Sequence, residues 1–216
     1  MLYNYNKGGE VILKKLLLLL PFTLLFFASP SEAATTTTHT VVSGDTMWKI
    51  AVKYQVGCQE IIDANTQISN PNLIYPGQKL NIPTKSAEET TTEQEILKLV
   101  NAERSKQGLS PLTLDWELSR VAKYKSEDMR DNNYFSHTSP TYGTPFQMMK
   151  SFGITYKSAG ENIAAGQKTA QAVMTDWMNS SGHKANILSK NYTKLGVGKA
   201  TGGSYGIYWT QMFISK

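Results

Sequence analysis

The first apolar zone of the chain is one uninterrupted run near its start. Leu16 to Phe27 contains no charged residue, Lys14 and Lys15 precede it, and mostly small residues follow it. A basic segment, an apolar core of about a dozen residues and a small-residue end are typical of a secretion signal. The run is shorter than the roughly 20 residues that span a bilayer. We therefore predict that residues 1–33 are a signal peptide, cleaved after Ala33, which leaves no stable membrane anchor.

The segment before this run suggests a later translation start. Residues 7–10 read Lys-Gly-Gly-Glu, which the codons of a ribosome-binding site would encode. We hypothesise that translation starts at Val11 or Leu13. Other codons at positions 7–10 of the gene would contradict this.

Residues 39–83 carry the pattern of a small strand–helix–helix–strand unit. The segment His39–Val42 alternates polar and apolar residues, as a strand does. Thr46 can cap a helix whose buried face includes Trp48, and a second helix follows around Ile61. Lys79–Pro83 completes the unit as a second short strand.

Residues 93–216 mix helical and strand patterns in one longer unit. Helical spacing recurs in segments that begin near Glu93, Asp115, Thr144 and Thr169. Strand patterns lie around Ile163, from Leu195 and from Tyr205. On the helix that Asp115 caps, one face is shared by Leu118, Val121, Ala122, Lys125 and Met129. This order predicts an α-β-α sandwich.

The two units are separated by a polar stretch. Residues 84–92 read Thr-Lys-Ser-Ala-Glu-Glu-Thr-Thr-Thr and show no apolar period, so we predict a flexible linker. The chain is therefore predicted to be α+β, a small βααβ module tethered to an α-β-α sandwich.

The net charge indicates which kinds of partner to expect, and the cysteine content indicates whether a disulfide is possible. The chain has a net charge of +5; residues 93–216 carry 15 basic and 10 acidic side chains, whereas residues 39–83 carry three of each. A basic surface favours an anionic partner. Since no Lys/Arg-rich run stands out, we expect an anionic cell wall as partner and no nucleic acid. The single cysteine, Cys58, allows no internal disulfide, and we expect a small apolar helix residue there.

Three motifs of the first unit stand in a characteristic order. They are Val42-Ser43-Gly44-Asp45-Thr46-Met47-Trp48-Lys49-Ile50-Ala51, Ile61-Ile62-Asp63-Ala64-Asn65 and Ile74-Tyr75-Pro76-Gly77-Gln78-Lys79-Leu80-Asn81-Ile82-Pro83. Together they resemble a LysM domain from end to end. That family binds N-acetylglucosamine-containing glycans, chiefly peptidoglycan and chitin, in a groove between two loops.

The resemblance places glycan-binding residues in both loops. They are Gly44, Asp45, Thr46, Met47, Asn72, Leu73, Ile74, Tyr75 and Gly77. Glycine-bearing loops let the backbone approach a sugar closely. Asp45 equally suits a turn or helix cap, Gly77 suits the turn alone, and Trp48 is expected in the core.

Five motifs follow one another through the second unit. They are Asn101-Ala102-Glu103-Arg104, Phe135-Ser136-His137, Gly160-Glu161-Asn162-Ile163-Ala164, Ser181-Gly182-His183-Lys184-Ala185-Asn186-Ile187-Leu188 after Trp177, and Trp209-Thr210-Gln211-Met212-Phe213. In this order they resemble the bacterial branch of the CAP superfamily of cysteine-rich secretory, antigen 5 and pathogenesis-related proteins. The resemblance covers the whole domain.

The CAP resemblance implies a cleft with histidines and acidic residues, which in some relatives binds a divalent metal. We expect the ligand cleft to contain His137, Glu161, Asn162, His183, Tyr208 and Gln211. The chain departs from eukaryotic relatives in two segments. Tyr208 to Gln211 stand where those relatives carry their second histidine, and Asn179 and Ser180 stand where they carry their second glutamate.

The residue types of this cleft allow three roles. Two histidines and one glutamate, here His137, His183 and Glu161, can hold zinc with an open fourth position. Without a metal, a His–Glu pair can act as acid and base. The same side chains can instead form a polar network that ties loops together.

The sequence thus predicts a secreted protein of the cell wall or spore envelope, with a LysM module for peptidoglycan and a CAP cleft for a ligand, metal or partner. One alternative is a wall-targeted hydrolase that uses His137, Glu161 or His183, with or without zinc. Another is a lipid-binding module. We weigh a binding role above catalysis, because no Ser/His/Asp order or catalytic cysteine is present.

Overall fold

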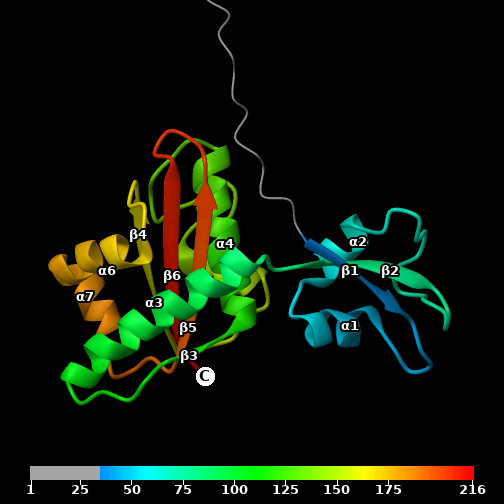
Figure 1. Ribbon diagram of the computed structural model, residues 1–216, viewed down its shortest axis with the longest axis horizontal. Helices are drawn as coiled ribbons and strands as arrows, with labels where there is room; N and C mark the ends of the chain where they lie inside the picture. The colour runs from blue at the N-terminus through cyan, green and yellow to red at the C-terminus, as the bar shows by residue number, and fades with distance from the viewer. Residues whose placement is uncertain (1–34) are drawn as a thin grey trace, which may run out of the picture. The chain divides into compact units, whose positions relative to one another are not determined.

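The computed structural model describes residues 35–216. The predicted signal peptide and the hypothesised starts at residues 11 and 13 lie outside these residues. In this part of the chain, no helix has the length and apolar character needed to cross a membrane. The chain is α+β, as predicted (Figure 1).

The first module consists of two strands and two helices. The strands β1 (Thr35–Thr40) and β2 (Lys79–Thr84) pair antiparallel, and between them lie α1 (Met47–Tyr54) and α2 (Cys58–Asp63). Its core contains Ile50, Ile61, Leu80 and Ile82, all fully buried. The first strand begins at Thr35 and ends at Thr40, earlier than the predicted His39–Val42. The threonines before His39 are β-branched, which suits a strand.

The second module is a four-stranded sheet between two layers of helices. Its strands are β3 (Thr113–Leu114), β4 (Ser158–Ala165), β5 (Lys194–Thr201) and β6 (Ile207–Ser215). Their order in the sheet is β3-β5-β6-β4; β3 is parallel to β5, and the other pairs are antiparallel. The helices are α3 (Ala87–Lys106), α4 (Trp116–Asp131), α5 (Pro145–Ser151), α6 (Ala170–Asn179) and α7 (Ser181–Ile187).

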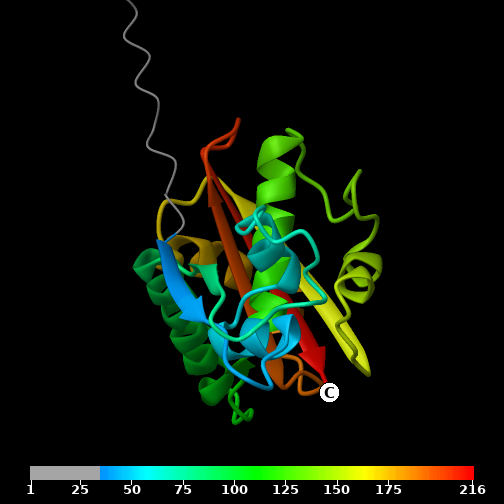
Figure 2. The ribbon, with the colours of Figure 1, turned by 90° about the vertical axis from the view of Figure 1, so that its right-hand side faces the viewer.

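The helices divide between the two faces of this sheet. One apolar core joins α3, α6 and α7 to residues such as Trp209 and Phe213, and a second joins α4 and α5 to Met212 and Ile214. Figures 1 and 2 show α3 and α4 on opposite faces of the sheet. The predicted α-β-α sandwich is therefore confirmed, and β4 lies at one edge of its sheet.

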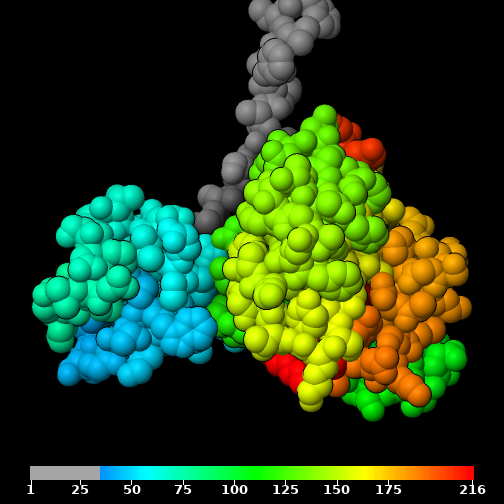
Figure 3. Space-filling view, turned by 180° about the vertical axis from the view of Figure 1, so that it is seen from behind, coloured from blue at the N-terminus to red at the C-terminus, as the bar shows by residue number. Residues whose placement is uncertain are grey.

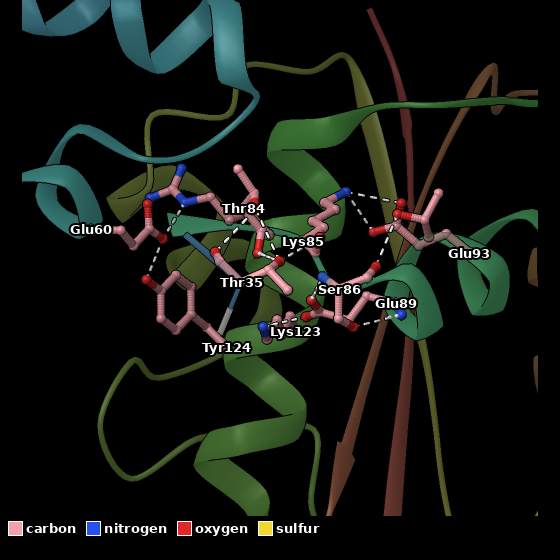
Figure 4. Close-up of polar contacts among 11 residues, drawn as sticks. Thr35, Glu60, Thr84, Lys85, Ser86, Glu89, Glu93, Lys123 and Tyr124 are labelled. Carbon is pink, nitrogen blue, oxygen red and sulfur yellow. Dashed lines mark hydrogen bonds and ion pairs between the residues drawn. The ribbon is translucent and has the colours of Figure 1, made fainter. Parts of the chain in front are cut away.

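The predicted linker over residues 84–92 is mostly helical. Thr84 still belongs to β2, and α3 begins at Ala87, where Ser86 accepts from the backbone N–H of Glu89 and Glu89 accepts from the backbone N–H of Ser86. Lys85 donates to Glu93, and Glu89 pairs with Lys123 of α4 (Figure 4). A flexible linker was therefore the wrong prediction here, since a capping box starts the helix earlier.

A helix that the sequence analysis did not predict follows Trp177. The helix predicted from Thr169 is α6, which ends at Asn179, and α7 then runs from Ser181 to Ile187. Ser180 is the only residue between the two helices and has an extended backbone. His183 thus lies on a helix.

Candidate functional site

A groove of about 340 Å³ opens between the two predicted loops of the LysM module. The residues that line it are Asp45, Thr46, Met47, Trp48, Cys58, Ile62, Pro71, Asn72, Leu73 and Ile74. Six of the nine predicted glycan-binding residues are among them. The other three, Gly44, Tyr75 and Gly77, lie beside the groove lining. Gly44 and Gly77 have positive φ angles of 86° and 90°, so both shape the turns that frame the groove.

Trp48 is the main correction in this module. We expected it in the core, yet 59% of its surface is exposed and it lines the groove. The buried face of α1 is formed by Met47, Ile50 and Ala51. Because these residues lie at positions i, i+3 and i+4, their spacing already places Trp48 off the buried face. This signal was present in the sequence.

The polar side chains of the first loop serve its own structure. Asp45 accepts from the backbone N–H of Val42 and pairs with the His39 ring, both at 2.9 Å, and His39 also contacts the Tyr54 hydroxyl at 3.1 Å. The Val42 amide, followed by His39, holds the pKa of Asp45 below its usual range. Thr46 caps α1 by accepting from the N–H of Lys49. The groove therefore offers mainly backbone groups and apolar surface.

Cys58 lies on α2 as expected and is half-buried. Burial raises the pKa of its thiol, which keeps it protonated and inert at neutral pH. It contributes a small apolar patch to the groove wall.

The second site is a hydrogen-bonded pair in the CAP-like module. His137 Nδ1 lies 2.7 Å from Glu161 Oε1. The His137 side chain is 53% exposed, whereas that of Glu161 is only 2% exposed. Burial raises the pKa of Glu161, and the bond to His137 and the charge of Lys125 oppose this. The second oxygen, Oε2, is buried and accepts no hydrogen bond from the described residues.

This geometry determines what the pair can do. When Glu161 is ionised it can only accept, so the neutral ring must carry its proton on Nδ1. Nε2 is then left with its lone pair on an exposed ring. It can accept a proton or a hydrogen bond from a ligand, which is the arrangement of an acid–base pair.

The six predicted cleft residues do not share one face of the sheet. Glu161 is opposite Met212 and faces α4, whereas the next residue, Asn162, is opposite Gln211 and faces α7. Asn162 donates to Gln211 Oε1 and to the carbonyl oxygen of His183, at 3.1 Å each. Strand alternation thus puts Asn162 and Gln211 into a separate buried network.

Tyr208 lies on the same face of the sheet as Glu161. In the pairing of β4 with β6, it is opposite a residue four positions further along β4 than Glu161. It is fully buried, packs against Met129 and Ile163, and its hydroxyl has no hydrogen-bond partner among the described residues. Its main role here is packing beneath the end of the loop that follows α4.

His183 reaches the neighbourhood of His137 from the opposite layer. Partial burial lowers the pKa of His183, and the charge of His137 adds to this. The segments that carry the two rings, yellow-green and orange in Figure 3, adjoin on one face of the module. Within residues 35–216, however, no three His, Cys, Asp or Glu side chains gather closely enough to hold a metal ion. The predicted zinc set of His137, His183 and Glu161 is therefore not assembled in this structure.

Two residues near the pair were not predicted. Asn186 of α7 donates to the Glu161 carbonyl oxygen at 3.1 Å and to Asn162 Oδ1 at 2.8 Å, which ties α7 to β4. Lys125 of α4 is fully buried beside the segment that carries His137. Its place on an otherwise apolar helix face was a visible signal in the sequence.

Family models match both modules. The model described as the cysteine-rich secretory protein family matches residues 97–213, and the LysM domain model matches residues 39–83. The order of a LysM domain followed by a CAP domain, predicted from the motifs, is confirmed.

Individual relatives agree with this. The uncharacterized protein YkwD of Bacillus subtilis is 52% identical over 155 residues, which are 71% of this chain and 58% of that protein. The crystal structure of an extracellular protein with an SCP domain from Bacillus anthracis aligns with a TM-score of 0.54 and 38% identity, over 65% of this chain and 47% of that one. The spore coat assembly protein ExsA of Bacillus cereus is 54% identical over 48 residues, 22% of this chain and 8% of its own length. The chain thus spans about half the length of the first two relatives.

Proposed function

Because the chain belongs to the cysteine-rich secretory protein family and carries a LysM domain before its CAP domain, we propose that it is a secreted, wall-associated protein. Its LysM groove binds the N-acetylglucosamine glycan of peptidoglycan. Its CAP domain presents the His137–Glu161 pair to a ligand or partner held near that wall. The likeness of its LysM domain to a spore coat assembly protein supports the spore envelope as a location beside the vegetative wall.

The exposed apolar lining of the LysM groove carries this proposal. Trp48 and Leu73 are both more than half exposed, and they face a groove that also contains Met47 and Ile74. Sugars bind by packing the apolar faces of their rings on such side chains, while the acetamide groups bond to loop backbone. Exposed apolar side chains that lie together in a groove mark a ligand-binding site, and tryptophans often dominate binding energy.

Binding of chitotetraose, measured by titration calorimetry, tests the groove. Trp48→Ala should weaken binding by about tenfold or more, which corresponds to a loss of about 1.4 kcal/mol. Val52→Ala is the matched control, because Val52 is an exposed apolar residue of the same helix outside the groove lining. Equal affinities of the Trp48→Ala variant and the wild type would contradict the proposed groove.

A second candidate function is hydrolysis of a wall component by the CAP domain. The observation that favours it is the half-exposed ring of a histidine paired through Nδ1 with a buried carboxylate. In such a reaction Nε2 would take a proton from an attacking water, and Glu161 would stabilise the resulting imidazolium. The three predicted zinc ligands do not converge within residues 35–216, so this candidate reaction uses the His–Glu pair alone.

Release of soluble fragments from purified peptidoglycan, followed by mass spectrometry, separates the two candidates. Fragments that form with the wild type and not with His137→Gln or Glu161→Gln would establish hydrolysis, and their masses would identify the bond cut. Retention on the wall without fragments would support a binding role for the CAP domain.

A further inference from the structure

The loop that carries His137 rests on a buried lysine of α4. Lys125 is 0% exposed, and its ammonium group donates to the Ser136 carbonyl oxygen at 2.7 Å, the His137 carbonyl oxygen at 3.1 Å and the Tyr134 hydroxyl at 3.0 Å. All three of its protons are therefore used by residues 134–137. Burial lowers the pKa of Lys125, and the charges of Glu161 and Asp128 oppose this.

A buried carboxylate one turn further along α4 holds the flanks of the same loop. Asp128 accepts hydrogen bonds from Tyr134, Ser139, Thr141 and Asn132. The loop around His137 is thus held by two charged side chains of α4. The ammonium group of Lys125 binds the backbone at the histidine itself, and the carboxylate of Asp128 binds residues on both sides of it. The intervening loop has little freedom to move relative to the sheet.

Hydrophobic packing does not require a charge at position 125. Neighbouring residues on this face of α4, such as Val121, Ala122 and Met129, are apolar and fully buried. A buried ammonium group costs stability unless it is fully hydrogen-bonded, and an apolar residue of similar size often serves stability as well. A lysine here therefore indicates a requirement other than stability.

We take that requirement to be the correct position of the His137 imidazole ring. The acceptor nearest the ring is the carbonyl group of His137 itself, one bond from the Cα that bears the ring. If this carbonyl group shifts, the ring shifts with it, and a displacement of about 1 Å is enough to disrupt an aligned pair of reacting groups. We propose that Lys125 is a positioning residue, which fixes the backbone at His137 so that its Nδ1 meets Glu161. This rests on the proposed function only in taking that pair as the working site of the CAP domain.

The experiment reads the tautomer of His137 by long-range proton–nitrogen NMR in the full chain without any wall ligand. At a pH where Glu161 is ionised and the ring is neutral, the wild type should show the Nδ1–H form. In Lys125→Met, loss of the loop anchor should break the contact with Glu161 and return the ring to the Nε2–H form of free histidine. The chain has three histidines, so single His→Gln variants assign the signals.

Two controls separate positioning from general damage. Lys123→Met removes the charge of a lysine on the same helix that instead pairs with Glu89 of α3, and it should leave the His137 signal unchanged. Arg104→Met removes a second buried cation, which donates to the carbonyl oxygens of Ile187, at the end of α7, and of Ser189 just after it. It should lower stability while His137 keeps the Nδ1–H form.

If Lys125→Met does not fold, Lys125→Gln replaces it, because glutamine is polar and too short to reach both carbonyl oxygens. Persistence of the Nδ1–H form in whichever variant folds would overturn the proposal. Loss of the Nδ1–H form in that variant, with this form retained in the two controls, would support the proposal. Since no glycan is present, this result is independent of whether the protein binds or cleaves the wall.

Discussion

Two buried carboxylates of the CAP domain differ in how completely they are hydrogen-bonded. Burial by itself would raise the pKa of both Asp128 and Glu161. In Asp128, the donors Tyr134, Thr141, Ser139 and Asn132 outweigh burial, so that its pKa lies below the usual value. Among residues 35–216, the Glu161 carboxylate has one hydrogen-bond partner, His137, and a second oxygen without any, so that burial keeps its pKa above the usual value. The two groups should therefore act on stability with opposite pH dependence.

For Glu161, the folded state holds the proton more tightly than the unfolded state does. Stability therefore falls as the pH rises above the ordinary carboxyl pKa of 4.5, where the buried group must ionise. In Glu161→Gln this cost is absent. Its unfolding free energy relative to the wild type should increase as the pH rises above that value. Urea unfolding followed by tryptophan fluorescence measures this difference.

Asp128→Asn should behave in the opposite sense and serves as the comparison. Its carboxylate contributes stability above the ordinary value of 3.8, and this contribution is lost as the pH falls through the lower pKa of the folded state. The variant should cost about 1–3 kcal/mol at neutral pH, since buried donors lose an acceptor. The cost should shrink on acidification below 3.8. A relative stability of Glu161→Gln that decreases with rising pH would show that His137 and Lys125 stabilise the Glu161 carboxylate by more than burial destabilises it.

At the scale of elements, β5 and α4 of the CAP domain pack very closely against each other. A Cβ atom at Gly198 would lie 2.2 Å from the backbone of Ala122 and Lys123, and one at Gly196 would lie 2.4 Å from that of Leu118. Backbone cannot move aside as a flexible side chain can. These glycines allow α4 to approach the sheet closely, and α4 carries both Lys125 and Asp128.

Gly198→Ala should therefore destabilise the fold by about 3 kcal/mol, at the upper end of the usual cost of overpacking. Gly182→Ala provides the matched control. No atom lies within 4 Å of a Cβ at Gly182, and this residue is part of α7. Alanine there should change stability by less than about 1 kcal/mol, in the favourable direction. Thermal unfolding of the two variants measures both values, and equal melting temperatures would mean that β5 and α4 are less closely packed.

The periodicity of the sequence predicted most elements, but it could not fix some of their ends. The face of α4 that includes Leu118 and Met129 follows from helical spacing alone, and both residues are buried. The start of α3 does not follow from helical spacing, because Thr90 to Thr92 have low helix propensity. Ion pairs of Glu88 with Lys199 and of Glu89 with Lys123 bind the first turn of α3 to distant parts of the chain. Such tertiary contacts are invisible in a local pattern.

The candidate cleft was predicted from the order of motifs, which does not say on which face of a strand a residue lies. Two of its residues from different motifs, His137 and Glu161, are 24 positions apart and hydrogen-bonded to each other. The motif order also placed Asn162 beside Glu161, although neighbours in a strand point to opposite faces. Applying that alternation to β4 would have separated them before the structure was known. The partners of Lys125 could not have been predicted, because two of them are backbone carbonyl oxygens of a loop and the third is the hydroxyl of Tyr134 in the same loop.

At the scale of the whole molecule, the proposed wall association would use a different kind of attraction in each module. Residues 39–83 carry three basic and three acidic side chains, so the LysM groove would bind glycan mainly through apolar contacts and hydrogen bonds. Residues 93–216 carry an excess of five positive charges, which would attract an anionic wall without defined geometry. Salt weakens the second attraction much more than the first, because ions screen exposed charges over about 10 Å at moderate ionic strength.

Cosedimentation of the full chain with purified cell wall should therefore separate the two contributions. We expect wild-type protein to stay bound when salt is added, because the LysM groove keeps its contacts. Trp48→Ala should still bind at low salt through the basic CAP domain and should be released as salt increases. Val52→Ala should follow the wild type. If the Trp48→Ala variant instead resists salt, a surface other than the LysM groove must hold the wall by uncharged contacts, and the His137–Glu161 cleft would be the first place to look, because its exposed imidazole can hydrogen-bond a sugar hydroxyl.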